Sequence, residues 1–361
     1  MILRKTHLAA AVGAALLAGG TAVQAQNLQV QLYGQVNRAL MWVDDETQNK
    51  VFHVDGQPSS TRFGIQGTAD IGGGLRAGAR IESEMKSNPS NVVTFANASQ
   101  GAVGGNVLFA ERWLDAFFEG SWGRINIGQG SGAADDASTI DLSGTAIANG
   151  VAISDWAGGI AFRAGGVPTG VTVGAAIDNL DFESRYDRAM YTTPVFGGFR
   201  AQAGFGQRTA TGEAAEASLW YSGKLMGDFQ AAIGWAKVSA DGTTTGDRET
   251  IGGSASWLHT SGFNITGAYT TRDLNVQNRD ISHYYIKPGY KFGPHAFSVG
   301  YYVGEDQPAA GVEVKAYSLG YVWNPVRWAE VYATYILYQG EAAGIDADDI
   351  TVAVIGTRIR F

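Results

Sequence analysis

The chain of 361 residues carries 26 basic and 34 acidic side chains, for a formal net charge of −8, and it contains no cysteine. The acidic balance and the lack of any Lys/Arg tract argue against nucleic-acid binding, and the lack of cysteine excludes a disulfide framework. Glycine, at 50 residues, has roughly double its usual share of ~7%, and aromatic residues make up 11% of the chain. This composition fits a β-protein with many tight turns better than low-complexity disorder.

The N-terminal segment has the pattern of an export signal. Arg4 and Lys5 precede an apolar run at 8–18, and Val23 and Ala25 supply the small residues of a cleavage site. The run is shorter than the roughly 20 residues that a helix needs to cross a bilayer, although a membrane anchor is the alternative. We expect residues 1–25 to be a cleaved signal peptide and 26–361 to be one domain. Its formal charge is −10, because two basic residues and no acidic ones are removed.

The rest of the chain alternates between apolar and polar residues with a period of two. Phe297, Val299 and Tyr301, for example, alternate with Ser298 and Gly300. This period is typical of strands with two different faces. It predicts sixteen strands, at 28–43, 60–70, 75–85, 107–119, 124–130, 184–194, 199–208, 214–224, 229–240, 249–260, 263–273, 280–292, 296–305, 312–324, 329–340 and 348–361.

The connections between these strands alternate in length. Every second one is a tight turn, and most of the others are longer and polar, the longest at 86–106 and 131–183. A soluble sandwich can show the same alternation within strands but has no reason to sort its loops in this way. A transmembrane barrel has short periplasmic turns and long extracellular loops, and its closure satisfies the backbone within the membrane. We therefore predict an all-β fold, a 16-stranded antiparallel transmembrane β-barrel.

Aromatic residues occupy the positions expected at membrane interfaces. Tyr317, Tyr321 and Trp323 lie on one face of a predicted strand that runs toward a short turn, and small residues, Ser318 and Gly320, lie on the other face. This arrangement is typical of the aromatic girdle of a membrane barrel.

Four segments carry a family resemblance. They read LYGQ at 32–35, RFGIQG at 62–67 followed by IGGGLRA at 71–77, RAMYTTPVFGGF at 188–199, and VIGTRIRF at 354–361. In this order they resemble the Gram-negative trimeric porin family, particularly its neisserial and betaproteobacterial branch. The resemblance implies a homotrimer in the outer membrane, in contact with lipid and lipopolysaccharide, with one pore in each protomer.

The resemblance also implies a third extracellular loop, at about 131–183, that folds inward and narrows the pore. The chain departs from the enterobacterial form there, because the loop contains no PEFGG motif and its Gly-rich segment at 158–176 has no assigned place. The final strand resembles an assembly signal that ends in Phe361 and is read by the barrel-assembly machinery.

The residues expected to line the constriction are charged. In the family, wall arginines face acidic residues of the third loop across an aqueous neck. By motif position the wall arginines are Arg62, Arg112 and either Arg185 or Arg188, of which only Arg185 shares the parity of Tyr191. Strand parity adds Arg80 and Glu82. The loop offers these acidic residues: Asp135, Asp136, Asp141 and Asp155. For Arg62 and Arg112 a structural role is the alternative, and for Asp135 and Asp136 an ordinary solvated loop.

The sequence offers little for catalysis, a cofactor or a metal. No histidine has the spacing of a metal ligand with carboxylates, and no G-x-S-x-G nucleophile motif occurs. The acidic runs at 44–46 and 346–349 are more typical of solvated loops than of cation sites. We therefore expect a porin, not an enzyme, for passive diffusion of small hydrophilic solutes. The rivals are a substrate-specific channel on the same barrel and an outer-membrane adhesin or hydrolase.

Overall fold

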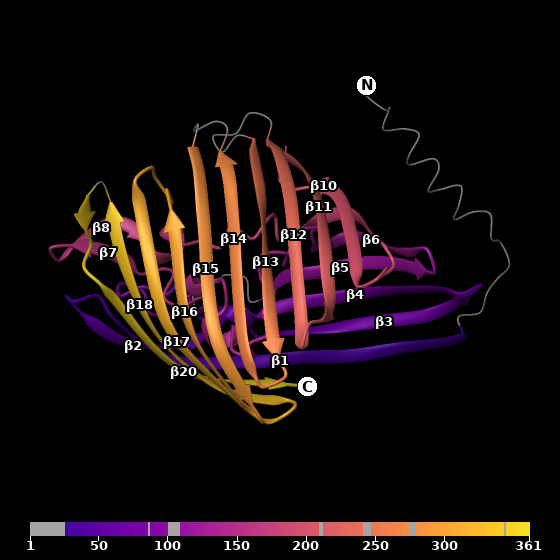
Figure 1. Ribbon diagram of the computed structural model, residues 1–361, viewed down its shortest axis with the longest axis horizontal. Helices are drawn as coiled ribbons and strands as arrows, with labels where there is room; N and C mark the ends of the chain where they lie inside the picture. Colours follow the sequence, from indigo (N-terminus) through magenta and orange to yellow (C-terminus); the bar gives the residue numbers. More distant parts are fainter. Residues whose placement is uncertain are drawn as a thin grey trace.

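A closed antiparallel barrel of sixteen strands forms the body of the computed structural model (Figure 1). The structure describes residues 26–85, 87–99, 109–208, 212–240, 247–274, 279–342 and 344–361. The expected signal peptide and positions 107 and 108 of the fourth predicted strand lie outside these residues. The barrel strands are β1 Gln26–Asp44, β3 Arg62–Gly72, β4 Leu75–Met85, β5 Phe109–Gly120, β6 Gly123–Ser131, β9 Arg185–Thr192, β10 Phe199–Gln207, β11 Gly212–Lys224, β12 Gly227–Ala240, β13 Arg248–His259, β14 Phe263–Leu274, β15 Arg279–Phe292, β16 His295–Glu305, β17 Val312–Val326, β18 Ala329–Ala342 and β20 Ile350–Arg360.

The barrel closes where the first strand meets the last. Gln35 of β1 pairs with Arg62 of β3 on one side and with Arg360 of β20 on the other. Strands of opposite walls cross at a large angle in Figure 1, where β3 and β4 run across the view and β12 to β14 stand upright. Such crossing follows from the tilt that strands need in order to close a barrel. The predicted alternation of tight turns and longer loops is confirmed.

The wall beside the second half of β1 contains a strand that the sequence did not predict. The segment 44–59 was expected to be a connection, and this prediction was wrong. The structure has a further strand there, β2 (Asn49–Asp55), which pairs with the second half of β1 so that Arg38 lies opposite Asp55. A short 3-10 turn, η1 (Gln57–Ser59), separates β2 from β3. The turn breaks the period-two pattern, because Pro58 within it cannot continue a strand ladder.

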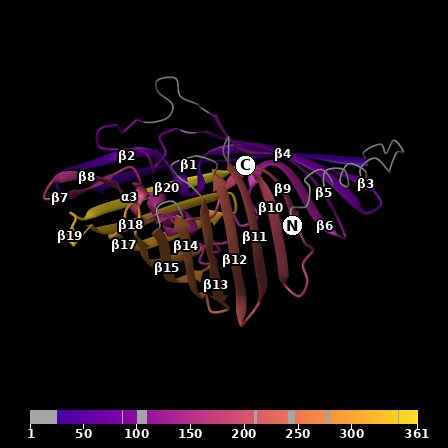
Figure 2. The same ribbon diagram turned by 90° about the horizontal axis from the view of Figure 1, so that it is seen from above.

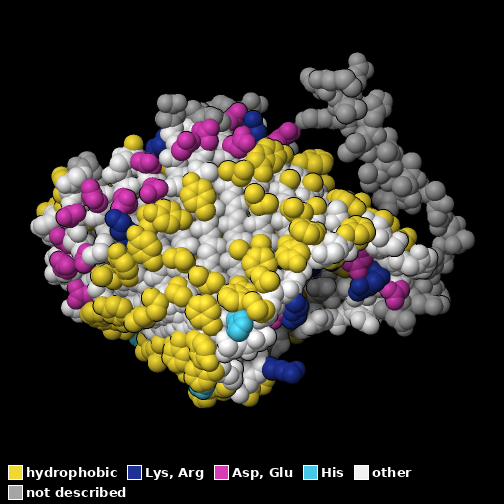
Figure 3. Space-filling model, viewed as in Figure 1, with side chains coloured by type: hydrophobic (Ala, Val, Ile, Leu, Met, Phe, Trp, Pro, Cys, Tyr) yellow, Lys and Arg dark blue, Asp and Glu magenta, His cyan; other side chains and the backbone are white. Residues whose placement is uncertain are grey.

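The barrel wall is apolar outside and polar inside. Ile251, Tyr269 and Leu319 are exposed, whereas Ser254 and Thr270 are buried among the inward-facing residues. Figure 3 shows the apolar outer wall and a row of acidic side chains along the edge that carries the longer loops. This inversion of the usual soluble pattern is the one expected for strands between lipid and an aqueous lumen. No helix among the described residues is long and apolar enough to cross a bilayer.

The long connection between β6 and β9 folds into the barrel, as predicted, and we call it the inner loop. It contains α2 (Ala146–Asn149), η2 (Ile153–Asp155), the hairpin β7 (Ala161–Ala164) and β8 (Val167–Thr172), and α3 (Val173–Ala176). Trp156 of this loop is buried against Tyr332 of β18, with the ring centroids 5.9 Å apart. The Tyr338 hydroxyl donates to the carbonyls of Ile153 (2.8 Å) and Trp156 (2.9 Å). The loop therefore shares a hydrophobic core with the inner wall.

The Gly-rich segment at 158–176 forms the hairpin and α3. The hairpin lies near β2 and β19 (Ile345–Asp346) at one end of the barrel (Figure 2). Arg163 of β7 donates to Asp45 at 2.6 Å, and Asp348 accepts from the backbone of Gly166 at 2.8 Å. The hairpin is thus tied to two other loops at the same end of the barrel.

Candidate pore constriction

Short polar side chains on the inner wall hold the inner loop in place. The Ser254 and Ser256 hydroxyls of β13 accept from the backbone of Ile140 and Leu142, both at 2.9 Å. Farther along, Asn149 donates to Ser318 of β17 at 3.0 Å. Small hydroxyl residues suit this position because they bring the loop close to the wall while satisfying its buried backbone groups. The loop therefore follows the inside of the wall from β13 to β17.

A buried ion pair adds a fixed point to the same path. Lys287 of β15 binds the carboxylate of Asp141, with side-chain exposures of 0% and 4%, and also donates to the Asn149 carbonyl at 3.2 Å. Burial by itself disfavours the charge of Asp141, but the ammonium of Lys287 holds the pKa of this carboxyl below its usual value. Asp141, one of the predicted constriction residues, is thus buried between the inner loop and the barrel wall.

The end of the inner loop is anchored by Glu183, which sequence reasoning missed. Arg208, the residue after β10, donates to this carboxylate at 3.1 Å, and Arg248 of β13 donates to it at 3.0 Å. Arg272 of β14 donates to the adjacent Phe182 carbonyl at 3.0 Å. The sequence does contain a clue to this anchor, because acidic residues are dense at 178–183, directly before a strand.

On the opposite wall, three arginines surround one carboxylate. Glu82 of β4 is 2% exposed and accepts from Arg112 at 2.8 Å and from Arg80 at 2.5 Å. Arg62 of β3 lies 3.9 Å from the same carboxylate and donates to Ser59 at 2.9 Å. The predicted residues Arg62, Arg80, Glu82 and Arg112 therefore form one group. Glu84, which was missed, accepts from Arg112 at 2.7 Å and shares the parity of Glu82.

A β-bulge explains how Arg112 reaches this group. In the pairing of β4 with β5, Glu82 lies opposite Trp113 and Ser83 lies opposite Glu111, so Arg112 is the extra residue. The bulge lets Arg112 and Trp113 both face inward although they are consecutive in the chain, since bulges re-aim side chains. It also lets Asp115 face inward together with Arg112, although strict alternation would put residues three apart on opposite faces. Arg80 lies over the Trp113 ring, 4.2 Å from its centroid.

Arg185 and Arg188 have different surroundings. Arg188 is 3% exposed and donates to Asp115 at 3.1 Å and to the Ser131 carbonyl at 2.8 Å, which joins β5, β6 and β9. Its side chain is thus part of the wall. Arg185, the first residue of β9, is partly exposed, and its charge acts on both Arg62 and Asp136. Of the two, Arg185 lies with the lumen charges.

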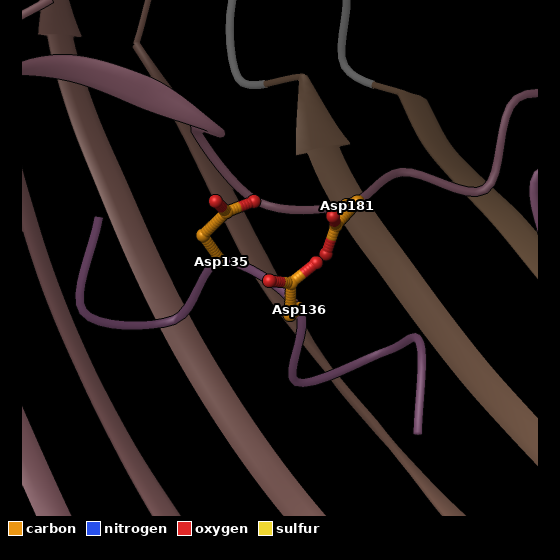
Figure 4. A group of neighbouring side chains, drawn as sticks. All are labelled: Asp135, Asp136 and Asp181. Atoms are coloured by element: carbon orange, nitrogen blue, oxygen red, sulfur yellow. The ribbon is translucent and has the colours of Figure 1, made fainter. Parts of the chain in front are cut away.

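The acidic residues of the inner loop lie at its two ends and in its middle. Asp135 and Asp136 follow β6, and Asp181 lies beside them just before β9 (Figure 4). Asp136 faces the lumen but is enclosed by the barrel, and this burial together with the charge of Asp135 raises its pKa to about 6. Burial, with the charges of Asp178 and Glu84, raises the pKa of Asp155 to about 7. The charges of Arg185, on the neighbouring strand β9, and of Arg112 on β5 oppose the rise in the pKa of Asp136.

The chain therefore combines a sixteen-stranded barrel, an inward loop and a charged lumen, and the sequence itself settles the family. A profile of the Gram-negative porin family matches residues 9–343. The chain belongs to the Gram-negative porin family. The resemblance noted in the sequence is thereby confirmed, and this porin resides in the bacterial outer membrane.

Individual relatives agree with this placement. The porin is 25% identical over 351 residues to outer membrane porin protein 32 of Delftia acidovorans. The alignment covers 92% of this chain and 90% of the relative. Among solved structures it resembles an anion-selective porin from Comamonas acidovorans, with a TM-score of 0.67 and 20% identity. The match covers 93% of this chain and 100% of the other. It also resembles OmpF of Salmonella typhi, with a TM-score of 0.61 and 13% identity over 92% of this chain and 97% of the other. These two structural likenesses concern the fold.

Proposed function

We propose that the porin conducts small hydrophilic solutes through a neck between the arginine group of β3 to β5 and the acidic residues of the inner loop. The observation that supports this most directly is that the charges of Arg185 on β9 and Arg112 on β5 favour the ionised form of Asp136 at the start of the inner loop. Opposed charges in a narrow, low-dielectric passage create a transverse field that acts on every ion passing through it. The neck comprises Arg62, Arg80, Arg112, Arg185, Glu82, Glu84, Asp135, Asp136 and Asp155.

We further propose that the neck prefers anions. Guanidinium groups stay protonated at all physiological pH values, whereas Asp136 and Asp155 have pKa values of about 6 and about 7 and are only partly ionised near neutrality. Glu82 and Glu84 are buried beneath the arginines that they pair with, so the positive groups are the more accessible ones. A similar preference is stated for the Comamonas acidovorans porin.

The assembly we propose is a homotrimer with one such neck in each protomer. One of the solved structures that resemble this porin, OmpT of Vibrio cholerae, was determined in a trimer form, with a TM-score of 0.60 and 17% identity. The transport itself is diffusion down a gradient and requires no catalysis.

Single-channel recording in planar bilayers tests the proposal. Purified folded protein should insert in stepwise, ohmic increments, often in threes, and a salt gradient should give a reversal potential of the sign of an anion-preferring pore. Folded protein without conductance would exclude a porin, and a cation-signed potential would exclude the anion preference. A flux that saturates with one solute would instead favour the substrate-specific channel.

A further inference from the structure

Three carboxylates converge at the base of the inner loop. Asp135 and Asp136 come from its beginning and Asp181 from its end, and one oxygen of each lies within 4.8 Å of the others. Figure 4 shows the side chains meeting from these two segments. The group is assembled by the fold, because Asp181 is far from the adjacent pair Asp135 and Asp136 in the sequence.

The described residues provide no ion-pair partner for this group. Within the described part of the chain, none of the three carboxylates forms an ion pair with a basic residue within 4.0 Å. Asp135 is 7% exposed, and its buried Oδ2 has no hydrogen-bond donor. Asp181 accepts from Ser138 at 2.9 Å and Asp136 accepts from Thr139 at 3.3 Å, which are contacts to neutral hydroxyls. Buried charges in proteins are normally paired or bound to a metal, and an unpartnered buried oxygen requires an explanation.

The chemistry of these oxygens matches a hard divalent cation. Ca²⁺ binds oxygen ligands at about 2.3–2.6 Å, so two ligands of one ion lie at most about 5 Å apart, as these oxygens do. Three carboxylates offer up to six oxygens, and Asp136 faces the lumen, where water completes the coordination. Mg²⁺ fits less well because it demands a rigid octahedron and loses its water reluctantly.

We propose that Asp135, Asp136 and Asp181 form a Ca²⁺ site that joins the two ends of the inner loop. Mutual repulsion of the three carboxylates disfavours this arrangement in the absence of a positive charge. Burial and the neighbouring carboxylates raise the pKa of Asp181 well above its usual value, as expected where anionic oxygens crowd together. A bound cation removes this repulsion and fixes the loop at its base. The site does not depend on the proposed ion preference of the pore.

Terbium luminescence tests the site directly. Trp220 of β11 packs against the hydrophobic cluster that contains Ala134 and Phe182, the chain neighbours of Asp135 and Asp181, so it is placed to sensitise Tb³⁺ bound between them. Folded porin in detergent should show Tb³⁺ emission on tryptophan excitation, and Ca²⁺ should displace it with an apparent Kd of about 0.1–1 mM, as in extracellular calcium modules. Trp220→Phe should abolish the emission while leaving Ca²⁺ binding by calorimetry intact.

Substitutions separate the site from general surface binding. The double variant Asp135→Asn/Asp181→Asn should weaken Tb³⁺ binding by about tenfold or more, which corresponds to ~1.4 kcal/mol. Asp136→Asn, whose exposed side chain is easier to replace, gives a second measure if the double variant does not fold. The matched control is Asp178→Asn, an exposed carboxylate of the same loop outside the group, which should bind Tb³⁺ normally.

Two results would overturn the proposal. One is unchanged Tb³⁺ affinity in folded Asp136→Asn and in the double variant. The other is Tb³⁺ emission that Ca²⁺ does not displace, or the absence of binding at 10 mM Ca²⁺, roughly tenfold above the weakest expected Kd. Either would leave a proton shared among the carboxylates as the explanation of their proximity. Because binding is measured without conductance, this failure is distinct from a failure of the proposed pore function.

Discussion

Phe361 and Gly34 join the two ends of the barrel through a reciprocal pair of backbone hydrogen bonds. Each residue donates its N–H to the other's carbonyl at 3.0 Å. The Phe361 ring also fills the space above Gly34, because a Cβ added there would lie 2.5 Å from its Cζ atom. Phe361 is exposed on the same outer face as Ile359 and Ile355, as the alternation of the last strand requires.

The first prediction concerns this closure. Deleting Phe361 removes two hydrogen bonds and the aromatic end of the final strand, so the amount of heat-modifiable barrel in the outer membrane should fall. Gly34→Val should have the same direction of effect, because its side chain displaces the Phe361 ring. Gly67→Ala, where an added Cβ has a nearest neighbour at 4.0 Å, is the control and should assemble normally. Normal barrel levels after deletion of Phe361 would count against its proposed role as an assembly signal.

The second prediction separates the neck from the surface. Two unit charges ~4 Å apart interact by about 4 kcal/mol at an effective dielectric of ~20, whereas charges more than ~8–10 Å away are screened by physiological salt. Arg62→Glu should therefore shift the reversal potential clearly toward cations. Asp346→Lys, on the exposed edge of the barrel, makes a charge change of equal size and should barely move it. Equal shifts would show that a diffuse surface field, and not the neck, sets the preference.

The third prediction is a dependence on pH. When EDTA keeps the proposed Ca²⁺ site empty, Asp136 and Asp155 have raised pKa values of about 6 and about 7, so both are mostly neutral at pH 5 and mostly ionised at pH 8. The anion preference should fall as the pH rises through this window, because negative charge is added to the neck. In Asp136→Asn/Asp155→Asn the preference should stay high and nearly constant from pH 5 to pH 8. An unaltered pH profile in this variant would assign the titration to other groups.

The fourth prediction concerns the anchor of the inner loop. Lys287→Met leaves the Asp141 carboxylate buried without its partner, a change that costs about 3–5 kcal/mol in buried pairs. We expect noisy, flickering conductance and a lower Tm for this variant. Lys287→Met/Asp141→Leu removes both charges and should recover most of the loss. Because the pKa of Asp141 is lowered in the folded state, the native pair should also weaken as the pH falls below the usual carboxyl range of about 4.

The sequence was sufficient for the strands because their period and their loop lengths are local signals. It was not sufficient for the inward-facing charges of β5, since the bulge at Arg112 changes the parity of every residue before it. One extra residue reverses which side chains face the lumen, and no local pattern marks it. The same limit applies to Arg112 and Asp115, which strict alternation would put on opposite faces.

The loop residues show a different limit. Lys287 and Asp141 are 146 residues apart, and Asp181 meets Asp135 only because both ends of the inner loop return to neighbouring strands. Such contacts depend on the path of the loop, which no familiar motif specified. A lysine in the middle of a strand with apolar neighbours was the available clue to the first of these pairs, because an unpaired charge there would be costly.

The inner wall of this porin divides its tasks between two sectors. Serine, lysine and arginine side chains of β13 to β17 hold the loop, while the accessible arginines of the neck stand on β3 to β5 and β9. Mutations that recharge the arginine sector therefore leave the loop's attachments untouched. During evolution, single substitutions in the arginine sector can change the solute preference of the pore while the inner loop, and with it the constriction, stays in place.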